Sequence, residues 1–266
     1  MLGSLEDVGN IGESVWLTRR KVPGNPTIED FTDADQPGLM SCTSCGPGCR
    51  VLDAGFRSAL TRDPRLWYLK IAERLGAHVL VSSDKNRDKL VANDPLLRFD
   101  AIVLFKSPEQ HWWSNLKKVQ QQDPDFHPIQ TLDTFMERWS EDYGLLLDVL
   151  RPQGRTLVLS FDDFCQAPEA HLKVLCARLG LPFDPRVLRN VRRDQHFFGG
   201  NALVGRTYRS ATAPLALKPL PPAPLPEADR TRLREHPRLQ AVWQDLMARY
   251  RHDFQAVTDT LLVVGG

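Results

Sequence analysis

The sequence of 266 residues lacks any apolar run that approaches the roughly 20 residues needed to cross a lipid bilayer. Its first residues also lack the basic segment and the apolar segment that together mark a secretory signal. Neither observation favours a membrane-spanning or a secreted protein. We therefore expect a cytoplasmic protein with no membrane partner.

The sequence also lacks a strong charge of either sign, because 34 basic residues nearly balance 33 acidic ones and leave a formal net charge of +1. A chain without a broad positive field is not built to bind nucleic acid as its main partner. Any site for an anion must therefore be local, formed by a few basic side chains. We expect the partner to be a small molecule or a carbohydrate.

Cysteine is scarce, and its odd count of five fits a reducing compartment better than a disulfide framework. Cys42, Cys45 and Cys49 stand close together, and the first pair has the spacing of zinc ligands. No fourth ligand lies near them in the sequence, so we favour a glycine-rich structural loop and expect no metal. Cys165 and Cys176 lie along an apolar helical face and are expected in the core.

Apolar residues make up 42% of the chain, enough for one large core, so we expect a single domain over residues 1–266. Amphipathic helical patterns alternate with short apolar runs. This rhythm predicts an α/β fold with a mostly parallel sheet flanked by helices. The expected helices are 65–75, a helix beginning near 85, one beginning near 108, 131–150, 163–179 and 230–253, and the expected strands are 78–81, 102–105 and 157–161. Residues 213–226 contain six prolines and are expected to form a stiff surface strap.

The stretch from Asp100 to Lys118, DAIVLFKSPEQHWWSNLKK, is the most informative part of the chain. Its apolar run is typical of a strand covered on both faces, and Lys106 follows at the end where open α/β sheets bind ligands. Pro108 favours the start of a helix. Ser114 lies eight residues after Lys106, so two helical turns would return its hydroxyl to the same place. A lysine and a hydroxyl that converge in this way suit a phosphate group.

This stretch resembles the strand and helix of the sulfotransferases that use 3′-phosphoadenosine 5′-phosphosulfate (PAPS). In that family an arginine, and a serine eight residues after it, bind the 3′-phosphate of the cofactor. Lys106 and Ser114 stand at these two positions. Three further segments resemble the family in the same order: HVLVSSDKN (78–86), LVLSFDDFCQAPEAHLKVLCARLGLPFDP (157–185) and HFFGGN (196–201).

The resemblance, which is to bacterial and carbohydrate-sulfotransferase-like members, implies PAPS as cosubstrate and a P-loop-like parallel sheet. It also implies site residues. The cofactor-binding residues implied are Lys106, Ser114, Ser83, Gly200, Asn201, Arg206, Gly265 and Gly266. The catalytic residues implied are Glu13, His196 and Lys85, with His196 either a base or part of the nucleotide loop. The rings of Trp112 and Trp113 are expected to pack in the core, with at most one near the adenine.

One element of the family pattern is expected to be absent. In the family, a glycine-rich loop between the first strand and first helix holds the sulfate end of the cofactor at a helix N-terminus. The opening residues MLGSLEDVGNIGES resemble the end of that helix followed by a glycine-glutamate element at Gly12 and Glu13. The resemblance implies transfer of a sulfuryl group to a carbohydrate or small-metabolite hydroxyl, and the absence of the loop predicts little or no turnover. The alternative is a noncatalytic nucleotide-binding or assembly protein with a degenerate sulfotransferase fold.

The carboxyl-terminal segment VTDTLLVVGG resembles the first strand of that fold and the opening glycines of the loop. The apolar run from Leu261 to Val264 predicts a strand that ends at Gly265 and Gly266. An empty strand position in the middle of a sheet would leave backbone groups unpaired. We therefore predict a circularly permuted order, with this tail inserted between neighbouring strands. An edge strand or a frayed tail is the alternative.

Overall fold

The computed structural model describes residues 2, 5, 7–12, 42, 45, 48–53, 55–56, 59, 67–82, 100–120, 129, 131–150, 156–188, 196 and 218–264. These residues belong to two compact units, each built from two stretches of chain. Unit 1 comprises Met1–Asn86 and Pro182–Ala216, and unit 2 comprises Arg87–Leu181 and Leu217–Gly266. Whether the chain behaves as the single domain expected from its length stays a prediction.

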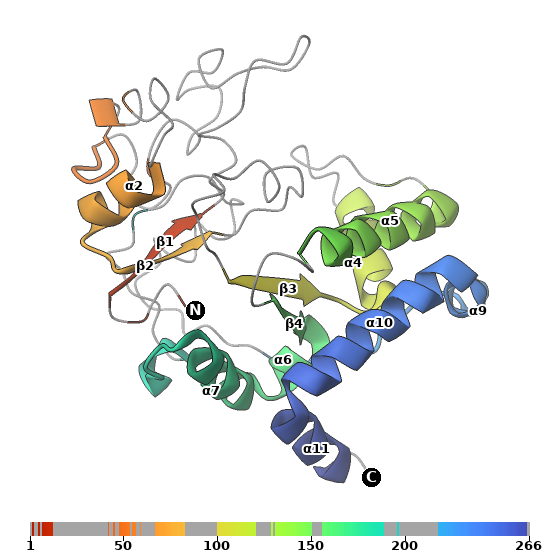
Figure 1. Ribbon diagram of the computed structural model, residues 1–266. Coiled ribbons are helices and arrows are strands. Elements are labelled where there is room, and N and C mark those ends of the chain that lie inside the picture. Colours follow the sequence, from red (N-terminus) through yellow and green to blue (C-terminus); the bar gives the residue numbers. More distant parts are fainter. Residues whose placement is uncertain are drawn as a thin grey trace. The chain divides into compact units, whose positions relative to one another are not determined.

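Unit 1 contains strands β1 (Val8–Gly12) and β2 (Val79–Ser82), helix α2 (Trp67–Leu75) and a short 3₁₀ helix, η4 (Pro185–Leu188). The two strands pair in parallel, with Val8 opposite Val79, and they run side by side in Figure 1. The expected helix and strand near residues 65–81 are thus confirmed.

The amino-terminal prediction for unit 1 was wrong, because residues 8–12 form a strand and not the end of a helix. Gly9 allows this strand to lie close to β2. A Cβ at Gly9 would lie 3.0 Å from carbon atoms of Leu75, Ala77 and Leu80, so a bare backbone is needed for the chain to lie beside β2. The position next to β2 is therefore taken by an amino-terminal strand.

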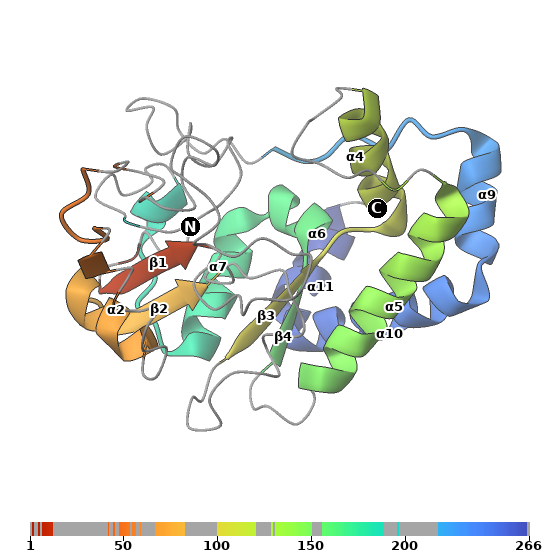
Figure 2. The same ribbon diagram turned by 90° about the horizontal axis from the view of Figure 1, so that it is seen from above.

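Unit 2 contains strands β3 (Ala101–Phe105) and β4 (Thr156–Ser160), which pair in parallel over five residues each. Figure 2 shows the two strands beside each other, with α4 after β3 and α6 after β4. Parallel pairing needs a crossover connection, and helices α4 and α5 supply it. The sequence prediction of short parallel strands linked by helices is confirmed for this unit.

The helices of unit 2 lie mostly where the sequence predicted helices, and α11 is the exception. They are α4 (Pro108–Gln120), α5 (Leu132–Leu150), α6 (Phe161–Gln166), α7 (Pro168–Leu179), α9 (Glu227–Glu235), α10 (Pro237–Asp253) and α11 (Gln255–Val264). Helix α5 buries Leu132, Phe135, Met136 and Trp139, which recur every three or four residues. No helix in the described part of the chain has the length and apolar composition to span a membrane.

The core of unit 2 is centred on Phe105 at the end of β3. Its side chain is fully buried and meets the rings of Trp243 and Tyr250 on α10 edge to face, at centroid distances of 5.5 and 6.3 Å. Tyr250 in turn contacts His171 of α7, which is also fully buried. Cys165 and Cys176 are buried as predicted. These contacts hold the strand ends rigidly against α10.

Two helices predicted as continuous are interrupted by proline. The helix expected over 163–179 is divided at Ala167, and the one expected over 230–253 is divided at His236. Pro168 and Pro237 each begin the second piece, because proline has no N–H to continue the preceding helix. The proline-rich segment forms neither helix nor strand where it is described, at residues 218–226.

The prediction for the carboxyl-terminal tail was wrong. Residues 261–264 are the last turn of α11, and β2 and β3 pair with β1 and β4 instead of with the tail. The helix starts after Phe254, whose carbonyl accepts hydrogen bonds from Val257 and Thr258. A run of four apolar residues fits a helix as well as a strand, and this preceding turn decides the outcome. The described structure therefore gives no support to circular permutation.

Candidate functional site

The ends of β3 and β4 present the described groups best suited to bind an anion. Lys106 follows β3, and its ammonium lies 3.4 Å from the hydroxyl oxygen of Ser114 on α4. Ser107 begins this helix: its hydroxyl accepts the N–H of Gln110, and Pro108 occupies the first helical position. The sequence expectation that Lys106 and Ser114 lie together agrees with this distance.

Lys106 is half-buried and lies among other cations. Burial lowers the pKa of its ammonium, and the positive charges of Lys117 and Lys118 lower that pKa further, while Asp162 opposes them. The ammonium also lies 4.8 Å from the centroid of the Phe161 ring, a cation–π distance. Lys106 is thus a partly desolvated cation, a group that an anionic ligand would be attracted to.

His111 belongs to the same face of α4. Burial, followed by the charges of Lys106 and Lys118, lowers the pKa of His111 to about 4. Its Nδ1 atom is buried and has no hydrogen-bond partner within the part of the chain that the structure describes. His111 is therefore neutral near pH 7, and it adds no further positive charge to the group around Lys106.

Asp162 joins the two strand ends. Its Oδ2 atom accepts a hydrogen bond from the backbone N–H of Ser107 at 3.0 Å, which links the start of α6 to the start of α4. Burial raises the pKa of the Asp162 carboxyl, while Ser107 and Lys106 act in the opposite direction. Its Oδ1 atom has no hydrogen-bond partner among the described residues.

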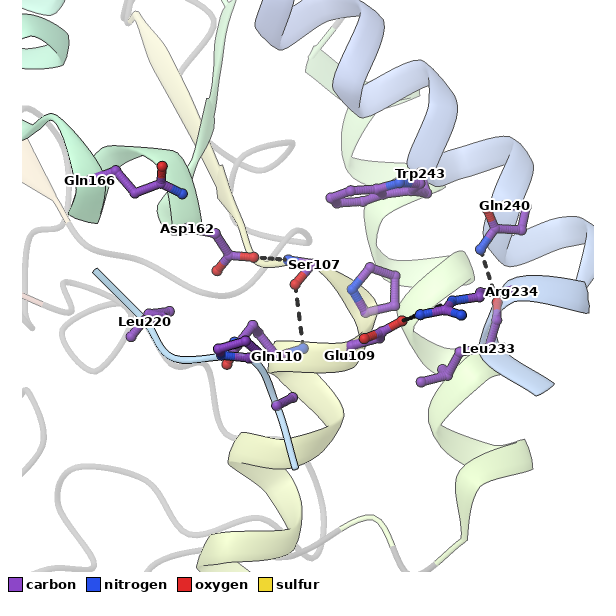
Figure 3. A pocket seen from close by; sticks show the side chains of 13 residues that line it. Ser107, Glu109, Gln110, Asp162, Gln166, Leu220, Leu233, Arg234, Gln240 and Trp243 are labelled. Carbon is purple, nitrogen blue, oxygen red and sulfur yellow. Dashed lines mark hydrogen bonds and ion pairs between the residues drawn. The ribbon is translucent and has the colours of Figure 1, made fainter. Parts of the chain in front are cut away.

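A cavity of about 330 Å³ opens beside Asp162 and Ser107 (Figure 3), within the size range of small-molecule sites. Helices α4, α6, α9 and α10 and the proline-rich segment line it. Its lining combines polar and apolar side chains, among them Asp162, Gln166, Gln240, Leu233 and Trp243. Lys106 and Ser114 do not line this cavity. Ser107, which follows Lys106 in the chain, does line it, and its N–H donates to Asp162 in the same lining.

Trp112 packs in the core as expected. Its side chain is 4% exposed, lies 5.3 Å from the Phe135 ring, and donates through Nε1 to Asp229 at 3.0 Å. This hydrogen bond ties α4 to α9. Trp112 therefore has a structural role in positioning the helix that carries Ser114.

A second group of chemically active side chains lies in unit 1. The Sγ atoms of Cys45 and Cys49 both lie 3.3 Å from Nδ1 of His196, and that of Cys42 lies 3.9 Å from it. The ligand atoms of all four residues lie within 4.8 Å of one another. Desolvation, followed by the Cys42 and Cys49 charges, raises the pKa of the Cys45 thiol to about 12. The sequence shows no fourth potential ligand near the three cysteines, and the structure brings His196 to them from a distant part of the chain.

Most of the other residues implied by the resemblance lie outside the described part of the chain. They are Glu13, Ser83, Lys85, Gly200, Asn201, Arg206, Gly265 and Gly266. Their roles stay predictions. Of the candidate site residues, the structure describes Lys106, Ser114 and His196, and only the first two lie together.

Sequence analysis did not single out Asp162 or His111. Asp162 had a usable signal, because an acidic residue directly after a buried strand lies at the edge where parallel sheets bind ligands. His111 lies between Lys106 and Ser114, and spacing alone does not reveal that its ring is buried.

No protein-family model matches the sequence, and no curated protein matches it. Among solved structures, the chain is similar to one described as a sulfotransferase domain from the curacin biosynthetic pathway, with a TM-score of 0.55. The similarity covers 92% of this chain and 90% of that chain, at 17% sequence identity. Such a distant similarity establishes the fold alone. The chain has a sulfotransferase-like α/β fold.

Proposed function

We propose that this chain binds PAPS through its 3′-phosphate at Lys106 and Ser114, and that it transfers the sulfuryl group to a hydroxyl of a carbohydrate or small metabolite. The observation that carries the proposal is the 3.4 Å approach of the Lys106 ammonium to the Ser114 hydroxyl at the end of β3. The sulfotransferase-like fold supports it, since this strand end matches the family's phosphate-binding position in the sequence resemblance.

The chemistry of a phosphate suits these groups. A phosphate oxygen accepts charge-assisted hydrogen bonds from an ammonium and a hydroxyl, and its negative charge would favour the charged form of Lys106, which burial disfavours. Lysine acts here as a point charge and lacks the two-pronged geometry of arginine. We therefore expect looser binding than an arginine at position 106 would give.

The cavity beside Asp162 is our candidate for the acceptor site. Trp243 and Leu233 offer apolar surface, while Gln166 and Gln240 offer amide groups, a combination that suits a ring bearing several hydroxyls. Transfer forms a bond from the acceptor oxygen to sulfur and breaks the bond from sulfur to the 5′-phosphate oxygen. The products are a sulfate ester and adenosine 3′,5′-bisphosphate.

The acceptor hydroxyl must give up its proton during this transfer. We assign that role to Asp162, because it lines the cavity, its Oδ1 atom has no partner among the described residues, and burial raises the pKa of its carboxyl. Asp162→Asn should leave nucleotide affinity within about threefold and lower the transfer rate by roughly a hundredfold or more.

Isothermal titration with adenosine 3′,5′-bisphosphate tests the phosphate site. Lys106→Met should weaken binding by roughly tenfold to a hundredfold, the value of one charge-assisted hydrogen bond. Lys173→Met is the matched control, since Lys173 is an exposed lysine on α7, and it should bind like the unmodified chain. Adenosine 5′-phosphate, which lacks the 3′-phosphate, should not distinguish Lys106→Met from the unmodified chain.

A transfer assay with labelled PAPS and a panel of carbohydrate and small-metabolite hydroxyls completes the test. Binding of the bisphosphate without any sulfated product would favour the noncatalytic nucleotide-binding alternative. Failure of the unmodified chain to bind the bisphosphate would reject the proposed function altogether.

A further inference from the structure

Four potential metal ligands of unit 1 converge from opposite ends of its sequence. Cys42, Cys45 and Cys49 come from one loop, and His196 follows them by 147 residues or more. Their ligand atoms all lie within 4.8 Å of one another. Three sulfur atoms and one ring nitrogen form one of the ligand sets of structural zinc sites.

The distances agree with a tetrahedral ion. With zinc–sulfur bonds of about 2.3 Å and a zinc–nitrogen bond of about 2.05 Å, tetrahedral geometry separates a sulfur from the nitrogen by roughly 3.6 Å. The three observed separations from His196 Nδ1 are 3.3, 3.3 and 3.9 Å. The three sulfur–nitrogen separations therefore bracket the tetrahedral value, and all four ligand atoms lie within 4.8 Å of one another. An iron–sulfur cluster needs its cysteine sulfurs farther apart than this spacing allows.

The backbone is arranged to support negative charge on two of the sulfurs. The N–H of Cys45 points at Cys42 Sγ at 3.5 Å, and the N–H of Leu52 points at Cys49 Sγ at 3.2 Å. In both cases the donor lies three residues after the cysteine. A sulfur that accepts N–H groups is stabilised as a thiolate, and such outer contacts orient metal ligands.

Two of the cysteines are buried in an apolar cluster of unit 1. Cys42 and Cys49 are 0% and 3% exposed and belong to an apolar cluster with Leu52 and Ile71. Arg74 of α2 fixes the chain that follows, because it donates to the carbonyls of Arg50 and Val51 and pairs with Asp53 at 2.6 Å. The ligand loop is thus anchored before any ion binds.

We propose that Cys42, Cys45, Cys49 and His196 bind one zinc ion that stabilises unit 1. Four protein ligands complete a tetrahedral shell and leave no position for water or substrate, so the ion is structural. Binding releases the three thiol protons to solvent. The ion would connect Cys42, Cys45 and Cys49 to His196, which lies at least 147 residues later in the chain.

Metal analysis of the full chain, purified under reducing conditions, is the first test. We expect about one zinc per chain. Cobalt(II) replacing the zinc should give the intense visible bands of a tetrahedral site and a sulfur-to-cobalt charge-transfer band in the near ultraviolet. Protein without zinc that also gives only the weak spectrum of six-coordinate cobalt would overturn the proposal. Mass spectrometry of the same protein gives a second check. A disulfide between two of the three cysteines, seen as a mass two hydrogens below that of the fully reduced chain, would also overturn the proposal.

Ligand variants provide the second test. His196→Asn should weaken cobalt and zinc binding by at least about a hundredfold, more than loss of an outer contact costs. His196→Cys restores a fourth ligand and should retain zinc. His78→Asn and Cys176→Ala, which change residues outside the cluster, are the controls and should keep one zinc. Equal metal binding by the His196→Asn variant and the unmodified chain would reject His196 as a ligand. The readout is independent of nucleotide binding.

Discussion

Ser114 Oγ accepts a hydrogen bond from the Lys106 ammonium at 3.4 Å and donates its own hydrogen to the carbonyl of Gln110 at 2.8 Å. The second bond runs to a carbonyl four residues earlier in α4, so the hydroxyl does not link α4 to another element. The serine hydroxyl is thus placed beside Lys106 without being needed for helix stability.

This arrangement predicts that Ser114→Ala separates binding from stability. Alanine is a better helix former than serine, so the free energy of unfolding should change by less than about 0.5 kcal/mol. Affinity for adenosine 3′,5′-bisphosphate should fall by roughly tenfold, because one hydrogen bond to a charged group is lost. Urea denaturation and titration calorimetry on the same sample measure the two quantities. A variant that binds the bisphosphate as well as the unmodified chain would contradict the assigned role of Ser114.

The buried histidines predict how stability depends on pH. The pKa of His111 is lowered to about 4 in the folded chain, against about 6.5 when unfolded, and the pKa of His171 is also lowered by burial. The unfolded chain therefore binds more protons in this window. The neutral histidines should contribute fully to the free energy of unfolding above about pH 6.5. This contribution should be lost as the pH falls towards about 4.

His111→Asn should make this decline shallower by about 1–3 kcal/mol between those pH values. The change is measured by urea denaturation at a series of pH values. His252→Asn is the control, because the His252 side chain is 82% exposed, and its pH profile should match that of the unmodified chain. An unchanged slope for His111→Asn would show that His111 is not held neutral.

A third prediction concerns the buried pair of His171 and Tyr250. His171 Nδ1 donates to the carbonyl of Ala167 at 2.8 Å, so Nε2 of the neutral ring accepts from the Tyr250 hydroxyl at 2.8 Å. Tyr250→Phe leaves a buried acceptor without its donor and should lower the free energy of unfolding by about 1–3 kcal/mol. Thermal and urea denaturation at pH 7.5 measure this loss. A double variant, Tyr250→Phe with His171→Leu, should lose less than the sum of the single variants.

The fourth prediction concerns Asn115, which is 4% exposed. Its side chain forms two hydrogen bonds with the backbone of Ile129, donating to the carbonyl at 2.9 Å and accepting the N–H at 3.1 Å. Asn115→Ala removes both and should cost about 1–3 kcal/mol of unfolding free energy. Asn115→Asp keeps only the acceptor and should not restore stability. Hydrogen exchange at the Ile129 amide should accelerate in Asn115→Ala, which removes the acceptor of that N–H, and should stay slower in Asn115→Asp, which keeps it. Unchanged protection in Asn115→Ala would contradict this account.

Local sequence determined much of unit 2. The apolar run at 102–105 and the Ser107-Pro108 pair were enough to place β3, the start of α4 and the approach of Lys106 to Ser114. Each of these features depends on neighbours within about two helical turns, where backbone geometry is fixed. The breaks at Pro168 and Pro237 were missed, since both helices were predicted as continuous, although proline ends a helix by its own chemistry and gave a local signal for them.

Tertiary structure alone decided the features that depend on distant residues. Nothing near Cys42, Cys45 and Cys49 in the sequence indicates His196, and nothing near Ser107 indicates that Asp162 accepts its N–H. The tail at 261–264 was predicted as a strand, and the structure makes it the end of α11, which begins after the turn at Phe254. Spacing along the chain determines what a helix or strand brings together, whereas contacts between elements depend on how the whole core packs.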